Sequence, residues 1–176
     1  MLRAKSCRCC DKDSEAALLM TPRTLVLGLG NPILRDDGVG WRVVEHASWL
    51  IGEPGIEFDR VALGGLALME RLIGYDRAIL VDAIQVVGGS PGAVYQLDID
   101  DLPTLHSDAV HDASLKAALQ LGRRLGATLP QEIVIFAVEA VDVLEFGEIL
   151  SPPVEAAVPL AVEKVLAAAR APVTPS

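Results

Sequence analysis

Three acidic residues and one histidine carry the chemistry that this sequence could perform. Asp36 and Asp37 follow a glycine-rich turn at the end of an apolar run. Asp82 closes a second apolar run, and His111 stands just ahead of an amphipathic stretch. Carboxylates and imidazoles are ligands for divalent ions such as zinc or nickel, and three protein ligands leave one position open for water or substrate. The competing interpretation is that Asp36 or Asp37 only caps the helix that follows.

These residues can meet only if one sheet carries them. Apolar runs of strand length alternate with helix-period patterns along the chain, which predicts a three-layer α/β/α domain with a five-stranded, mainly parallel, twisted sheet. In such folds ligands collect at the carboxyl ends of strands, where Asp37 and Asp82 are expected. We expect strands at 24–30, 56–62, 77–83, 93–99 (an antiparallel edge) and 132–138, and helices at 38–51, 66–74, 112–126 and from 152 onward.

Composition limits the partners of this chain. Of its 176 residues, 51% are hydrophobic and only 4% aromatic, which favours helices packed on a buried sheet over a β-sandwich. The formal net charge of −9 argues against a nucleic acid or an anionic membrane as partner. No apolar run in the first 21 residues is long enough for a signal peptide or a membrane span.

The three cysteines, at positions 7, 9 and 10, give no disulfide framework. Their crowding near one end favours a reducing, cytoplasmic location and excludes a thiol nucleophile from the rest of the chain. We expect residues 1–21 to form a disordered extension and residues 22–172 to form a single domain.

Two familiar motifs are incomplete here. Gly28 and Gly30 begin a dinucleotide-binding pattern, but its third glycine is replaced by Ile33, and the two aspartates would repel a pyrophosphate. Residues 88–92 match the pattern around a hydrolase serine, yet Pro91 has no N–H to donate to an oxyanion. We therefore expect neither a nucleotide cofactor nor a nucleophilic serine.

Several motifs occur in a fixed order between residues 24 and 170. They are Gly-Leu-Gly-Asn-Pro at 28–32, Asp-Asp-Gly-Val-Gly at 36–40, Gly-Gly at 64–65, Val-Asp-Ala at 81–83, His111, Phe-Gly-Glu at 146–148 and Leu-Ser-Pro at 150–152. This series resembles the hydrogenase maturation proteases. Members of that family are endopeptidases that remove a short C-terminal extension from the large-subunit precursor of nickel–iron hydrogenases after nickel insertion.

The resemblance implies a phosphorylase/hydrolase-like fold and a cytoplasmic monomer whose partner is that precursor. It implies that Asp37, Asp82 and His111 are both the catalytic and the metal-contacting residues. The nickel would be carried by the precursor, and another divalent ion such as zinc could occupy the empty site. The residues expected to contact substrate are Asn31, Asp36, Gly64 and Gly65.

Alternatives remain for both mechanism and function. A metal could lower the pKa of a bound water, or one aspartate could act as general base on a free water. A peptidyl-tRNA hydrolase also carries the Gly-Leu-Gly-Asn-Pro turn, although the acidic charge disfavours a tRNA partner. A metal-dependent chaperone that docks the large subunit without cutting it is the non-enzymatic alternative.

Overall fold

The computed structural model describes residues 22–99 and 110–173, with the backbone alone for residues 110–114. The described strands form one five-stranded sheet in the order β2-β1-β3-β5-β4. Four of them are parallel, and β4 pairs with β5 in the antiparallel direction. The predicted sheet is confirmed, including its antiparallel fourth strand. The strands are β1 (Thr24–Leu29), β2 (Ile56–Val61), β3 (Arg77–Ile84), β4 (Val94–Asp98) and β5 (Glu132–Glu139).

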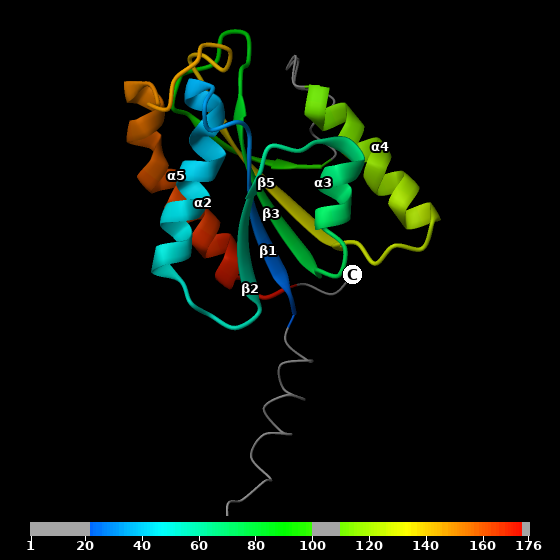
Figure 1. The fold of residues 1–176 in the computed structure, drawn as a ribbon. Helices are drawn as coiled ribbons and strands as arrows, with labels where there is room; N and C mark the ends of the chain where they lie inside the picture. Colours follow the sequence, from blue (N-terminus) through cyan, green and yellow to red (C-terminus); the bar gives the residue numbers. More distant parts are fainter. Residues whose placement is uncertain (1–21, 100–109, 174–176) are drawn as a thin grey trace, which may run out of the picture.

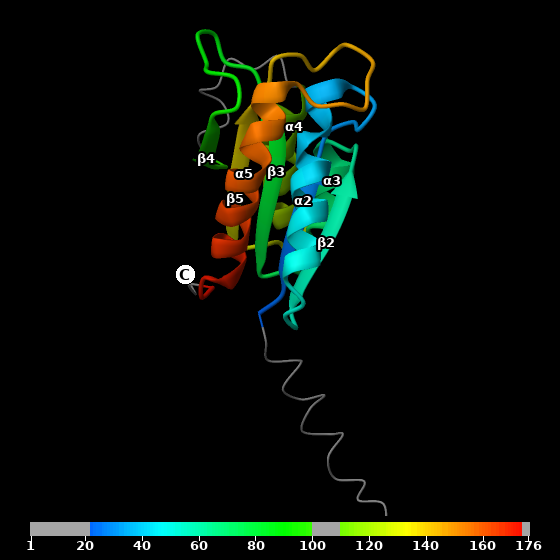
Figure 2. The same ribbon diagram turned by 90° about the vertical axis from the view of Figure 1, so that its left-hand side faces the viewer.

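Helices cover both faces of this sheet, which confirms the three-layer arrangement. One face carries α2 (Val39–Leu50) and α5 (Pro152–Arg170), and the other carries α3 (Gly65–Arg71) and α4 (Val110–Arg124) (Figure 1). Figure 2 views the sheet from the side of α2 and α5, with β2 and β4 at opposite edges. A 3-10 turn, η1 (Arg35–Gly38), leads directly into α2.

The strand side chains alternate between two hydrophobic cores. Val26 and Ile79 pack in the core under α2 and α5, whereas Leu27 and Leu80 pack in the core under α3 and α4. Every residue of β1 is buried, which explains why its sequence does not alternate between apolar and polar residues.

The strand order creates a switch point beside β1. From β1 the chain first adds β2 on one side and then returns to add β3 on the other. The helices that follow β1 and β2, α2 and α3, lie on opposite faces of the sheet. At such a point the connections diverge and leave a crevice outside the carboxyl ends of the strands.

Two glycines hold the start of α2 tightly against the strands at this point. A Cβ atom at Gly40 would lie 2.4 Å from the carbonyl oxygen of Val81 and 2.5 Å from that of Leu29. A Cβ atom at Gly28 would lie 2.4 Å from the carbonyl oxygen of Gly40. Because neither position can hold a side chain, the first turn of α2 can pack directly on the backbones of β1 and β3.

Some predicted boundaries were wrong. The helix α4 begins at Val110, two residues before the predicted start, so His111 is its second residue and does not precede it. The expected disordered extension, residues 1–21, lies outside the described residues. No helix among the described residues is long and apolar enough to cross a membrane.

We predict that Gly40→Ala lowers the free energy of unfolding by about 1–3 kcal/mol, because the new methyl group would collide with two backbone carbonyls. A glycine-to-alanine substitution within a helix normally raises the free energy of unfolding by up to about 1 kcal/mol. The expected change at Gly40 therefore has the opposite sign. Gly52→Ala, just after α2, is the control for the added methyl group, because a Cβ atom there meets nothing within 4 Å. Urea unfolding of both variants tests the prediction, and equal stability of the two would contradict it.

Candidate active site

A hollow of about 240 Å³ opens at the carboxyl ends of β1 and β3, at the switch point. Its walls come from the turn after β1, the segment after β2 and the end of β3. Two of the three predicted catalytic residues, Asp37 and Asp82, line it together although they are far apart in the sequence. The lining residues are Leu29, Gly30, Asn31, Leu34, Asp37, Ala62, Leu63 and Asp82.

Asp37 is held by the turn that precedes it. The backbone N–H of Asn31 donates a hydrogen bond of 2.5 Å to Oδ2 of Asp37. Gly30 has a φ of +103°, and a Cβ atom there would lie 1.9 Å from the carbonyl oxygen of Asp37, so only glycine fits. The Asp37 side chain is half-buried and makes no capping hydrogen bond to η1 or α2. Asp37 therefore lies in the first turn of η1 but does not cap a helix through a side-chain hydrogen bond.

Asp82 enters the hollow from β3. Side chains alternate along a strand, and Leu80 packs under α3 and α4, so Asp82 faces the same side of the sheet. Its Oδ1 accepts a hydrogen bond of 2.8 Å from the N–H of Ala83. The Asp82 side chain is half-buried, like that of Asp37. Two carboxylates thus share one solvent-accessible hollow.

His111 belongs to the helix that covers the face of Asp82. The helix α4 begins at the end of the molecule where β1 and β3 end (Figure 1). The side chain of His111 lies outside the described part of the structure, so its role as third ligand stays a prediction. Among the side chains that are described, no group of three His, Cys, Asp or Glu residues could hold a metal ion.

Asp36 occupies a different environment from its neighbour. Its side chain is fully buried, with 0% exposure. Its oxygens accept hydrogen bonds from the N–H groups of Val141 (2.9 Å), Asp142 (3.3 Å) and Ser151 (2.6 Å), and from the Ser151 hydroxyl (2.8 Å). A carboxylate that is buried and satisfied in this way has no surface to offer a substrate, so its position argues against the predicted substrate contact. Asp36 instead ties η1 to the start of α5.

The other predicted substrate contacts lie near the hollow. Asn31 lines it, and its side-chain oxygen accepts a hydrogen bond of 3.2 Å from the N–H of Ile33. Gly64 and Gly65 follow the lining residue Leu63, and Gly65 has a φ of +57°. Neither glycine is itself a lining residue, and their contact with substrate stays a prediction.

The segment between β5 and α5, residues 140–150, forms a loop beside the turn after β1; its two ends are buried and its middle is exposed, and we call it the exposed loop. The N–H of Arg35 donates to the carbonyl of Gly147 (2.7 Å), and the N–H of Gly147 donates to the carbonyl of Ile33 (2.9 Å). Hydrogen bonds from the backbones of Leu144 and Glu145 hold the pKa of Asp142 below its ordinary value. The loop is therefore ordered, although it lies at the surface.

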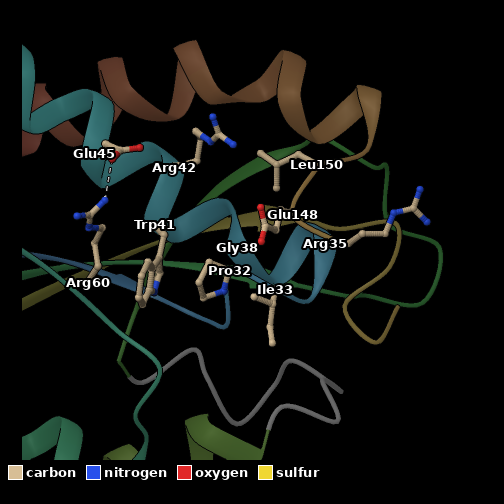
Figure 3. A pocket seen from close by; sticks show the side chains of 10 residues that line it. All are labelled: Pro32, Ile33, Arg35, Gly38, Trp41, Arg42, Glu45, Arg60, Glu148 and Leu150. Atoms are coloured by element: carbon tan, nitrogen blue, oxygen red, sulfur yellow. Dashed lines mark hydrogen bonds and ion pairs between the residues drawn. The ribbon is translucent and has the colours of Figure 1, made fainter. Parts of the chain in front are cut away.

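Sequence reasoning missed a second hollow, of about 310 Å³, on the other side of the same turn (Figure 3). It also missed the hydrogen bonds that Ser151, a residue of the Leu-Ser-Pro motif, donates to Asp36. A serine just before two prolines indicated a helix start, but nothing indicated that its hydroxyl would bond to an aspartate 115 residues away. The residues lining the second hollow are Pro32, Ile33, Arg35, Gly38, Trp41, Arg42, Glu45, Arg60, Glu148 and Leu150.

We predict that Asp36→Asn lowers the free energy of unfolding by about 2–3 kcal/mol, because an amide offers one acceptor fewer to buried N–H and O–H donors. The adjacent Asp37→Asn is the matched control and should cost less than about 1 kcal/mol, since only one hydrogen bond to its carboxylate is present. Denaturant unfolding of the two variants measures the difference. A smaller loss for Asp36→Asn than for Asp37→Asn would refute the structural role of Asp36.

Comparison with known proteins places this geometry in a family. A family model described as hydrogenase maturation protease matches residues 63–168. The chain is 33% identical over 153 residues to the hydrogenase 2 maturation protease of Escherichia coli (strain K12), covering 84% of this chain and 91% of that protein. It is 29% identical over 147 residues to the hydrogenase expression/formation protein HupD of Rhizobium leguminosarum bv. viciae, covering 81% and 71%.

Solved structures agree with these relatives. The hydrogenase maturating endopeptidase HybD from E. coli superposes with a TM-score of 0.73 at 32% identity, covering 84% of this chain and 92% of that one. The [NiFe] hydrogenase maturation protease HybD from Thermococcus kodakarensis gives a TM-score of 0.64 at 25% identity, covering 84% and 99%. With these matches and with two carboxylates at the switch point, the chain belongs to the hydrogenase maturation protease family.

Proposed function

We propose that this protein is an endopeptidase that removes the C-terminal extension of a nickel–iron hydrogenase large-subunit precursor once nickel has been inserted. The observation that carries the proposal is that Asp37 and Asp82, from separate segments, line one hollow in a member of this family. The three cysteines lie within the first ten residues and none follows, which supports a reducing cytoplasm, where we place the protein as a monomer.

In this proposal Asp37, Asp82 and His111 engage the nickel that the precursor carries. Two carboxylates and an imidazole are suitable donors for such an ion, and the described hollow already supplies both carboxylates. A nickel ion in the precursor, or a zinc ion in its place, would polarise a carbonyl group or lower the pKa of a nearby water. Contact with nickel would also restrict cleavage to precursors whose metal is in place.

Hydrolysis needs a group that accepts a proton from water. The water oxygen bonds to the peptide carbonyl carbon, a carboxylate takes its proton, and the C–N bond breaks as the amine nitrogen receives a proton. Oδ2 of Asp37 is held by Asn31, while Oδ1 makes no hydrogen bond to the described residues, which favours Asp37 for this role. General bases of this kind contribute roughly 10²–10⁴-fold.

The surface beside the hollow supports a protein as substrate. Leu144, Phe146 and Ile149 in the exposed loop are 82%, 80% and 82% exposed. Large apolar side chains gathered on one surface segment are typical of protein-docking sites. Since this loop is bonded to the turn that carries Asp37, a docked protein would lie next to the carboxylates.

A chaperone that binds the nickel-loaded precursor without cutting it is the second candidate. The same hollow and apolar loop would serve it, so a binding experiment cannot separate the two functions. Only a processing assay does so. Membership of the maturation protease family, together with the hollow of carboxylates, favours cleavage over both this candidate and a peptidyl-tRNA hydrolase.

We predict that Asp37→Asn, Asp82→Asn and His111→Ala each lower kcat/KM for nickel-loaded precursor by at least about 10²-fold, because each removes a group that contacts the reacting centre. Cleavage is followed by the mass loss of the large subunit on a gel and by mass spectrometry. The wild-type protein should leave nickel-free precursor uncut.

Two matched variants serve as controls for this assay. Glu70→Gln removes an exposed carboxylate outside the hollow, and His46→Ala removes a histidine from α2. Both should cleave at about the wild-type rate. If the three site variants fold normally and still cleave like these controls, the assignment of the site is wrong.

A further inference from the structure

The second hollow adjoins the first along one turn of the chain. Residues of the turn between β1 and α2 face the two hollows in alternation, so the turn is the wall that separates them. Gly30, Asn31, Leu34 and Asp37 line the first hollow, and Pro32, Ile33, Arg35 and Gly38 line the second.

Residues at the end of β2 and just after it also line both hollows. Arg60 lines the second hollow, and Ala62 and Leu63 line the first. Between them, the indole N–H of Trp41 donates a hydrogen bond of 3.4 Å to the carbonyl of Val61. A peptide chain that passes from the first hollow to the second along β2 would therefore cross the contact between Trp41 and Val61.

The second hollow contains one arginine whose charge is not balanced by an ion pair. Of its three arginines, Arg35 pairs with Glu145 and Asp142, and Arg60 pairs with Glu45 at 2.9 Å. Arg42 is half-buried, and no described residue forms an ion pair or a hydrogen bond with its guanidinium group. The chain has a net charge of −9, so a guanidinium group without an internal partner stands out. Such a guanidinium group is suited to bind a carboxylate from another molecule.

The remaining lining is mixed: Glu45 is paired with Arg60, Glu148 adds an exposed carboxylate, and the other walls suit an apolar side chain. Trp41 and Pro32 line one side, and Leu150 lines the side next to α5 (Figure 3). The guanidinium of Arg60 lies over one face of the Trp41 ring, 5.6 Å from the ring centre, in a cation–π contact. The hollow thus combines an aromatic wall with one cation, Arg42, and one carboxylate, Glu148, and neither of them forms an ion pair with a described residue.

We propose that this second hollow binds the C-terminal extension of the precursor, with a carboxylate of the extension paired to Arg42. The inference rests on the proposed function, because an endopeptidase must hold its substrate on both sides of the bond that it cuts. The first hollow takes the nickel-bearing side, so the extension leaves in the other direction. The carboxylate is either the chain terminus or an acidic side chain of the extension.

Trp41 allows this binding to be measured without any cleavage. The chain has two tryptophans, so Trp49→Phe leaves Trp41 as the single emitter. In a Trp49→Phe, Asp37→Asn protein, a tryptophan-free synthetic peptide with the sequence of the extension should produce a saturable change in Trp41 emission. Adding Arg42→Met should weaken the binding by about tenfold, the effect of losing a charge-assisted hydrogen bond.

Two comparisons complete the titration. Arg170→Met removes an exposed arginine at the far end of α5 and should leave the affinity unchanged. A peptide with a C-terminal amide distinguishes the two carboxylates, since it loses affinity only if the chain terminus pairs with Arg42. The proposal is overturned if Trp41 emission does not respond up to the solubility limit of the peptide, or if Arg42→Met binds as tightly as its parent.

Precursor cleavage gives an independent measurement. Arg42→Met should raise KM by about tenfold and change kcat by less than about twofold, as expected for loss of binding that is equal in ground and transition states. Arg42→Lys should recover part of the loss. If the wild-type protein cuts no precursor, the proposed function fails, and the peptide titration still decides whether the hollow binds the extension.

Discussion

The buried carboxylate of Asp36 is the interaction on which the site depends. A 3-10 turn places two consecutive aspartates on different sides of the backbone, and their environments differ accordingly. Asp36 is fully buried and accepts hydrogen bonds from Ser151 and from the exposed loop, which fixes the turn against the start of α5. Because the turn is fixed, the neighbouring Asp37 is held in the hollow. The buried Asp36 fixes the position of the turn, and the half-buried Asp37 is available for chemistry.

The sheet supplies the second constraint. Gly28 and Gly40 let the first turn of α2 contact the backbones of β1 and β3, so the turn carrying Asp37 lies directly over the end of β3. Asp82 emerges at that end, on the face that α4 covers. Two acidic side chains near one another are unfavourable unless a cation or a proton joins them. In the function proposed here the cation is the nickel of the precursor, so the proposal predicts that cleavage follows metal insertion.

Much of this arrangement could be predicted from the sequence because it follows from local patterns. The apolar runs and the glycine-rich turn identified the strands, the antiparallel edge and the placement of Asp37 and Asp82 at neighbouring strand ends. The role of Asp36 could not be predicted, since its partner Ser151 is 115 residues away and only the folded chain brings them together. The lack of an ion pair at Arg42 among the described residues was equally hidden, because it depends on which carboxylates Arg35 and Arg60 engage. The start of α4 was misplaced by two residues, as helix ends have weaker sequence patterns than helix interiors.

A crystal structure of the protein with a divalent ion bound is the decisive experiment for the proposed three-residue site. Anomalous scattering from nickel or zinc locates the ion without reference to any assumed ligand. We expect one ion in the first hollow, about 2.0–2.2 Å from a carboxylate oxygen of Asp37, a carboxylate oxygen of Asp82 and a ring nitrogen of His111. An ion bound elsewhere, or one in the hollow that leaves His111 or either aspartate uncoordinated, would contradict the account.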